Sequence, residues 1–203
     1  MKKILITGYR ASELGIFSLK HAGIGIIKKA IQRRLIPLLE EGLEWVVVSG
    51  QWGVELWAAE AALELKKTDY PHLQLAVIPP FLEQEEKWGD DKKAYYANVL
   101  RGADYVNSVT KTKYDGPWQF KERDKFLLRN TDGLLLVYDE ETGGSPRYIK
   151  QQAEHFGERQ TYPLIVINSY DLASVAEDEQ GELPADEANY DLYPADQGYD
   201  DEI

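Results

Sequence analysis

Short apolar segments alternate with amphipathic segments along this 203-residue chain, and this alternation restricts the possible folds more than any other feature. The expected strands cover residues 3–8, 45–49, 73–78, 105–109, 134–138 and 164–167. The expected helices cover residues 24–41, 54–67, 91–101, 118–130 and 146–157. Strands that are apolar on both faces and alternate with helices are typical of a parallel sheet covered on both sides. With right-handed crossovers, we predict an α/β, Rossmann-like doubly wound fold with a mainly parallel sheet.

A single domain is expected over residues 1–170, followed by an acidic segment. Residues 171–203 contain twelve acidic side chains and no Lys or Arg, whereas residues 1–170 contain 23 of each sign. This segment also has few aliphatic residues, so we predict a disordered tail over residues 171–203. The net charge of −12 therefore belongs to the tail and says little about a binding site in the domain.

Composition argues against several kinds of site. The chain has no cysteine and three histidines, so disulfides, thiolate chemistry and a multi-histidine metal centre are not expected. The apolar runs fall far short of the roughly 20 residues that span a bilayer, and the N-terminal run is too short for a signal peptide. We expect a cytoplasmic protein with no membrane insertion and no metal, while the sequence specifies no cofactor.

Ligands of such folds bind beyond the carboxyl ends of the strands, and the first bend at that edge follows residues 3–8. Here Gly8 lets the backbone turn sharply off the strand, and Arg10 places a cation at the mouth. A guanidinium at this position suits a phosphate or a carboxylate. A turn glycine with a surface arginine would give the same short pattern.

The second bend, residues 49–55, joins a buried strand to an alanine-rich helix. Its glycines permit close backbone approach, and amides at the helix start can hold an anion. The pattern is neither GxGxxG nor a P-loop, which disfavours an NAD enzyme or a P-loop NTPase. A tight turn with an acidic helix start is the structural alternative. The predicted ligand-binding residues are Ser49, Gly50, Gln51, Gly53 and Glu55.

Within this bend, Glu55 would repel a phosphate, so we assign its carboxylate to ribose hydroxyls or a base edge. Glu55 is also the one candidate catalytic residue, since hydrolysis of an N-glycosidic bond needs a carboxylate. We expect Gly53→Ala and Glu55→Gln to leave folding intact and to weaken ligand binding.

The third bend precedes the helix expected at residues 146–157 and contains Gly143, Gly144 and Ser145. Two glycines and a hydroxyl before a helix start make a second candidate anion cradle. Ser145 could equally act only as an N-cap. Nucleotide-like ligands carry a phosphate and a sugar that need separate supports, so two cradles at one edge favour a phosphorylated sugar held between them.

A basic and aromatic segment at residues 111–129 is open to two interpretations. It has six basic and three acidic side chains. Base stacking with phosphate contact would produce this composition. We favour the commoner cause, an amphipathic helix with a solvated face and with Phe120, Leu127 and Leu128 in the core.

Several longer blocks of the sequence resemble the YpsA family of Firmicutes. Their order and spacing match over about residues 1–170, and the tail lies outside the match. The blocks are Thr7-Gly8-Tyr9-Arg10, Glu13-Leu14-Gly15-Ile16-Phe17, Glu41-Gly42-Leu43-Glu44-Trp45, Ser49-Gly50-Gln51, Gly53-Val54-Glu55-Leu56-Trp57-Ala58-Ala59-Glu60-Ala61, Gln119-Phe120, Asp132-Gly133-Leu134-Leu135-Leu136 and Gly144-Ser145-Pro146.

The resemblance implies a Rossmann-like superfamily that includes the DNA-processing protein DprA and the LOG-type phosphoribohydrolases. It also implies a nucleotide-derived ligand and, because family members are linked to cell division in Gram-positive bacteria, a protein partner in division. Ser49-Gly50 with Gly53 and Glu55 resembles the Ser-Gly…Gly-Ile-Asp turn of DprA. Gly143-Gly144-Ser145 occupies the place of the LOG signature Pro-Gly-Gly-x-Gly-Thr-x-x-Glu, but lacks its proline, its glycine–threonine stretch and its glutamate. LOG activity is therefore not carried over.

Three functions follow, in this order. The first is a binding protein or sensor for a nucleotide-derived ligand that acts on a division partner. The second is a hydrolase of a nucleotide N-glycosidic bond, with Glu55 as its carboxylate and with Arg10 and Ser145 holding phosphate. The third is a DprA-like single-strand DNA binder, which the neutral domain and acidic tail disfavour because DNA affinity comes from phosphate neutralisation. The sequence leaves open whether any reaction is catalysed.

Overall fold

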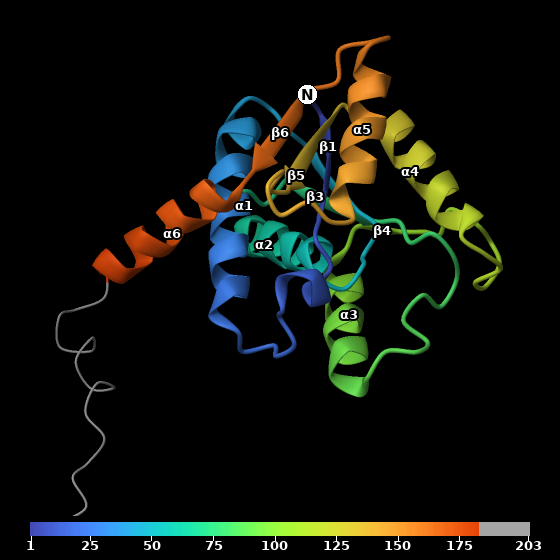
Figure 1. The fold of residues 1–203 in the computed structure, drawn as a ribbon, viewed down its shortest axis with the longest axis horizontal. Helices are drawn as coiled ribbons and strands as arrows, with labels where there is room; N and C mark the ends of the chain where they lie inside the picture. The colour runs from blue at the N-terminus through green and yellow to red at the C-terminus, as the bar shows by residue number, and fades with distance from the viewer. Residues whose placement is uncertain (183–203) are drawn as a thin grey trace, which may run out of the picture.

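Six parallel strands form one sheet in the computed structural model, which describes residues 1–182 (Figure 1). The order across the sheet is β4-β3-β2-β1-β5-β6, and every neighbouring pair is parallel. The chain therefore builds outward from β1 in one direction and then returns to add β5 on its other side. The predicted α/β, doubly wound parallel fold is confirmed. The strands are β1 (Lys3–Gly8), β2 (Trp45–Val48), β3 (Gln74–Val77), β4 (Tyr105–Val106), β5 (Gly133–Val137) and β6 (Leu164–Ile167).

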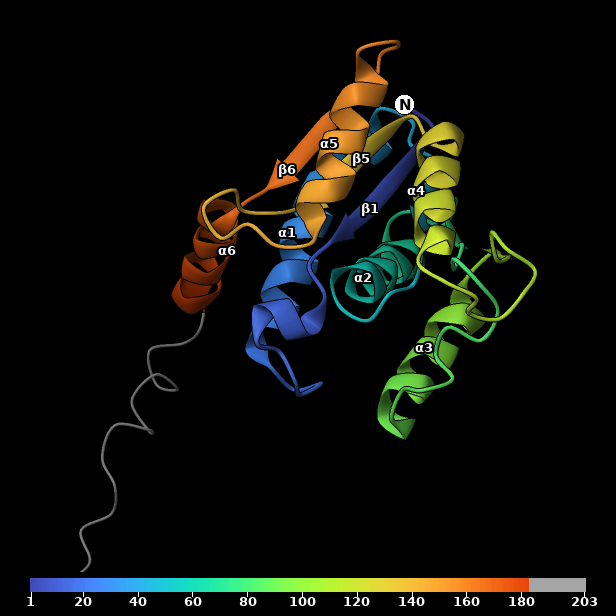
Figure 2. The ribbon, with the colours of Figure 1, turned by 45° about the vertical axis from the view of Figure 1, so that its right-hand side comes forward.

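Helices cover both faces of this sheet. Figure 2 shows α4 and α5 over one face and α1 over the other, where α2 packs against α1. Among residues 1–182, none of the helices combines the length and the apolar character needed to cross a bilayer. The helices are η1 (Ala11–Leu14, a 3-10 turn), α1 (Ala22–Glu40), α2 (Val54–Thr68), α3 (Asp90–Gly102), α4 (Trp118–Asn130), α5 (Pro146–Gly157) and α6 (Ser169–Glu182).

The central strands are apolar because both of their faces are covered. Every residue of β5 is buried, and Ile4 and Ile6 of β1 have no exposed surface. On the face covered by α1 and α2, Trp57 is fully buried. Such burial fixes the register of β1 against β2 and β5, which in turn fixes where their carboxyl ends lie.

The domain extends beyond its expected end at residue 170, because α6 follows β6 and packs on the domain. α6 packs against α1, and its Val175 is only 3% exposed. Ion pairs join the acidic side of α6 to the basic side of α1, among them Arg33–Asp178 at 2.6 Å and Arg34–Asp171 at 2.7 Å. Residues 171–182 are therefore a packed helix and not a disordered tail. The rest of the expected tail, residues 183–203, lies outside the described residues.

Candidate functional site

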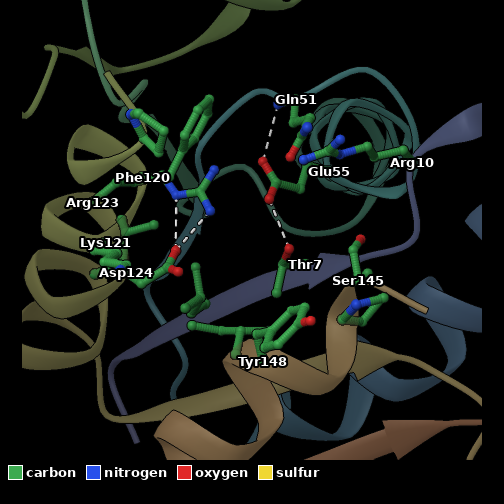
Figure 3. A pocket seen from close by; sticks show the side chains of 16 residues that line it. Thr7, Arg10, Gln51, Glu55, Phe120, Lys121, Arg123, Asp124, Ser145 and Tyr148 are labelled. Carbon is green, nitrogen blue, oxygen red and sulfur yellow. Dashed lines mark hydrogen bonds and ion pairs between the residues drawn. The ribbon is translucent and has the colours of Figure 1, made fainter. Parts of the chain in front are cut away.

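A cavity of about 290 Å³ opens at the carboxyl end of β1, where the strand order reverses between β1 and β5. Ligands of doubly wound folds bind at this point, because the loops after the two strands diverge there. Four separate parts of the chain supply its walls (Figure 3). They are Leu5, Thr7, Gly8 and Arg10; Gln51 and Glu55; Pro117, Phe120, Lys121, Arg123, Asp124 and Leu127; and Ser145, Pro146, Tyr148 and Ile149.

The structure brings half of the ten predicted ligand-binding residues to this cavity. The other five lie in the second and third bends and do not line the cavity. The lining residues are Gly8, Arg10, Gln51, Glu55 and Ser145. The remaining ones are Ser49, Gly50, Gly53, Gly143 and Gly144. All three bends therefore meet at one edge of the sheet, although they contribute in different ways.

Glu55 sits in the first turn of α2 with a carboxylate held by three donors. Its Oε1 accepts a hydrogen bond from Thr7 Oγ1 at 2.7 Å. Its Oε2 accepts from Ser49 Oγ at 2.5 Å and from the Gln51 amide at 3.0 Å. The residue is 5% exposed and still lines the cavity. The Ser49 hydroxyl and the Gln51 amide, which belong to two predicted ligand-binding residues, thus donate to Glu55, and the second bend presents a carboxylate to the cavity.

Arg123 of α4 extends this polar network across the cavity. Its Nη1 donates to Ser49 Oγ at 3.3 Å, while Nε and Nη2 donate to Asp124 Oδ1 at 2.9 and 2.7 Å. Figure 3 shows Arg123 and Asp124 on the α4 side, facing Glu55 and Thr7. These contacts fix the orientation of Arg123 and use much of its hydrogen-bonding capacity within the protein.

The third bend is occupied by a carboxylate in the same way. The Ser145 amide and hydroxyl both donate to Glu13, each at 2.7 Å, and the Arg10 amide donates to Glu13 at 2.9 Å. Ser145 Oγ therefore does not cap α5. Tyr9 Oη donates to the Gly143 carbonyl at 2.7 Å. Tyr9 and Glu13 thus position the bend that the sequence analysis expected to be an open anion cradle.

The ionisation of Glu13 is coupled to this loop. Partial burial would raise the pKa of the Glu13 carboxyl, but hydrogen bonds from Ser145 and Arg10 outweigh it, so the pKa lies below its ordinary value of 4.5. Since the folded-state pKa is depressed, the stabilisation is fully present above about 4.5 and is lost as the pH falls through the folded-state value.

We expect Glu13→Gln to lower the melting temperature near neutral pH and to do so less as the pH falls below about 4.5. At low pH the wild-type carboxyl is protonated and resembles the amide. Thermal melts of both proteins across this range measure the difference. Glu141→Gln, in the loop between β5 and α5, is the control and should change stability little, because within residues 1–182 the exposed Glu141 carboxylate forms no hydrogen bond or ion pair. A difference that stays constant through the acid range would contradict the assigned role of Glu13.

Two cations and two aromatic rings complete the cavity. Arg10 and Lys121 line it and form no ion pair within residues 1–182. Phe120 and Tyr148 lie on opposite helices of its wall (Figure 3). The prediction that Phe120 belongs to the core is wrong, because the ring is half-buried and lines the cavity, whereas Leu127 is buried as expected.

Sequence reasoning missed Thr7, Lys121, Arg123 and Tyr148 as lining residues. The one signal that could have found part of this wall was the basic and aromatic composition of residues 111–129.

Comparison with known proteins places this chain in a family. The YpsA family model, described as the YspA SLOG family, matches residues 4–172. The chain belongs to the YpsA family. It is 56% identical to a UPF0398 protein of Brevibacillus brevis over 183 residues, which cover 90% of this chain and 97% of the relative. A UPF0398 protein of Lysinibacillus sphaericus is 58% identical over 176 residues, covering 87% and 98%.

A UPF0398 protein of Bacillus cereus is similar at 51% identity over 180 residues, covering 89% of this chain and 97% of the relative. The YpsA-family match confirms the resemblance seen in the sequence. It includes β2 to β6, all of β1 except Lys3, and every segment that lines the cavity, and it ends within α6.

Proposed function

We propose that this YpsA-family protein binds a nucleotide-derived ligand in the cavity beside β1. The observation that carries the proposal is the presence, in one cavity, of a buried carboxylate and of two cations that form no ion pair within residues 1–182. Arg10 would hold the phosphate, with Lys121 adding positive charge to the cavity, and Glu55 would accept a hydrogen bond from a ribose hydroxyl. The family's link to cell division makes a sensor that acts on a protein partner the corresponding role.

The orientation of the ligand follows from charge. A phosphate avoids Glu55 because like charges repel at short distance. A carboxylate offers about four acceptor positions, and protein donors fill three of those on Glu55. The remaining position suits a hydroxyl of the sugar. The phosphate then lies toward Arg10 at the mouth, and the base lies toward the rings of Phe120 and Tyr148, where stacking contributes about 1–3 kcal/mol.

We expect a nucleoside monophosphate such as AMP to bind the wild-type protein and the matching nucleoside to bind much more weakly. Arg10→Ala should weaken AMP binding by about 10- to 100-fold, because a charge-assisted hydrogen bond contributes about 1.5–3 kcal/mol. Isothermal titration calorimetry measures both affinities. Lys67→Ala is the matched control, since Lys67 is an exposed cation in the last turn of α2, far from the cavity.

Failure of all common nucleoside monophosphates to bind, or equal affinity of the Arg10→Ala and wild-type proteins, would contradict the proposal. Weakening by Lys67→Ala to the same extent would point to a general charge effect instead.

Hydrolysis of the N-glycosidic bond is the second candidate function. The observation that favours it is the fixed orientation of the Glu55 carboxylate, which three donors hold at the cavity wall. A carboxylate so placed can stabilise a ribosyl cation and orient a water molecule. Release of free base from a nucleoside monophosphate, abolished in Glu55→Gln, would select the hydrolase. Binding without base release would select the sensor.

A further inference from the structure

A second hollow adjoins the cavity beside β1 and shares Arg10 and Gln51 with it. This hollow has a volume of about 230 Å³ and is walled by Phe17, Trp52 and Trp88. It borders a larger depression of about 640 Å³, with Phe17, Trp52 and Lys92 common to both. We refer to the two together as the aromatic groove. Because Arg10 borders both the cavity and the groove, one anion at its guanidinium would contact both.

The groove has a rigid aromatic floor and an exposed aromatic rim. Trp52 packs edge to face against Tyr95, with ring centroids 5.4 Å apart, and against Trp88 at 6.4 Å. These contacts hold the indole in place without ligand. Phe17, in the loop between η1 and α1, is 76% exposed. An exposed ring beside a fixed indole is an arrangement that can stack on a planar group.

The charges of the groove suit a polar ring-bearing group. Lys92 Nζ lies 5.3 Å from the Trp52 ring centroid, and neither Lys20 nor Lys92 forms an ion pair within the described part of the chain. Asp90 and Asp91 line the larger depression but not the hollow that contains Arg10, and they supply acceptors there. The groove thus offers one cation, Lys92, in the hollow that contains Arg10. In the larger depression it offers both the Lys20 ammonium and carboxylates that can accept from amino or hydroxyl donors.

From this placement we infer that the groove is a second subsite and that the ligand is a two-part nucleotide. Its phosphate bridge lies at Arg10, one nucleoside occupies the cavity beside β1, and the second ring-bearing group stacks between Phe17 and Trp52. The inference rests on the proposed function and specifies its ligand class as dinucleoside phosphates linked through a pyrophosphate.

Calorimetry with ADP and with diadenosine diphosphate tests this inference, because the two probes have the same number of phosphorus atoms. We expect diadenosine diphosphate to bind about 10-fold tighter or more, in line with the contribution of one stacked base. Phe17→Ala should remove this advantage and leave ADP affinity unchanged. Tyr170→Ala, which removes a ring that is also 76% exposed, is the matched control and should change neither affinity.

The outcomes of this experiment distinguish between the two-part ligand, the groove as its second subsite and the proposed function. If ADP binds and diadenosine diphosphate binds no tighter, the two-part ligand is excluded and the proposed function stands. If the advantage survives Phe17→Ala, the second group lies elsewhere and the groove assignment is wrong. If neither probe binds and no nucleoside monophosphate does, both the proposed function and this inference fail.

Discussion

Replacing Gly53 by alanine is expected to destabilise the protein by about 3 kcal/mol or more. Gly53 has φ +134° and ψ −141°, a backbone conformation that is close to glycine-only and costs other residues about 1–3 kcal/mol. A Cβ at this position would also lie 2.6 Å from both the Ala11 amide nitrogen and the Tyr9 carbonyl oxygen. Both are backbone atoms that cannot rotate away, and such overpacking adds about 1–3 kcal/mol.

The measurement is thermal unfolding, where this loss corresponds to about 6–12 °C for a chain of this size. Gly25→Ala is the control. Gly25 lies inside α1 with open space around it, so alanine should be neutral there or stabilise by up to about 1 kcal/mol. An unchanged melting temperature for Gly53→Ala would contradict the close approach of the two bends.

Because Gly53→Ala is expected to destabilise the fold, this variant does not test ligand binding alone. The sequence-based expectation that Gly53→Ala leaves folding intact is at odds with this geometry. Gly53 forms a bridge with Arg10, and Val54 donates to the Tyr9 carbonyl, so the second bend is tied to the first. A loss of binding in Gly53→Ala would therefore reflect displacement of Arg10 as much as any direct contact.

Glu55→Gln, which the sequence alone predicted to leave folding intact, is expected to lower the free energy of unfolding by about 1–3 kcal/mol. The hydroxyls of Thr7 and Ser49 can rotate toward new acceptors, but the Gln51 amide has a fixed direction. Glutamine supplies one oxygen where the carboxylate supplies two, so at least one buried donor loses an acceptor. Asp69→Asn, at the exposed end of α2, is the control and should have little effect.

Glu55→Gln should also weaken AMP binding. An AMP analogue without the ribose hydroxyls distinguishes the loss of a direct contact with the ribose from a change in the shape of the site. If Glu55 accepts from ribose hydroxyls, AMP should lose about 10-fold in affinity on Glu55→Gln, while its dideoxy analogue, which lacks both hydroxyls, should lose much less. This is a double-mutant cycle between side chain and ligand. Equal losses for both ligands would mean that Glu55 acts only through the shape of the site.

The positions of the six strands and of helices α1 to α5 could be predicted because their signals are local. The helices expected at residues 118–130 and 146–157, and the strand at residues 164–167, have those bounds in the structure. The meeting of three bends at one edge also followed from sequence, because the carboxyl ends of parallel strands share an edge. β4 is shorter than expected and covers only Tyr105–Val106.

The occupants of the bends could not be predicted, because they depend on contacts between distant residues. Glu13 and Ser145 are 132 positions apart, and no local pattern indicates that the carboxylate of one fills the helix start of the other. The packing of α6 was missed for a related reason. The apolar stripe of α6 is narrow. Its acidic side chains pair with basic side chains of α1, among them Arg33 and Arg34, and these pairs do not show in the sequence of α6 alone.

Amide NMR spectra recorded during a titration with AMP are the sharpest test of nucleotide binding in the cavity beside β1, because they show both whether the ligand binds and where. We expect the largest shifts at the backbone amides of Arg10, Gln51, Lys121 and Tyr148, and no shift at Val175 in α6. Shifts confined to residues outside the cavity, or spectra that do not change at millimolar AMP, would contradict binding in this cavity.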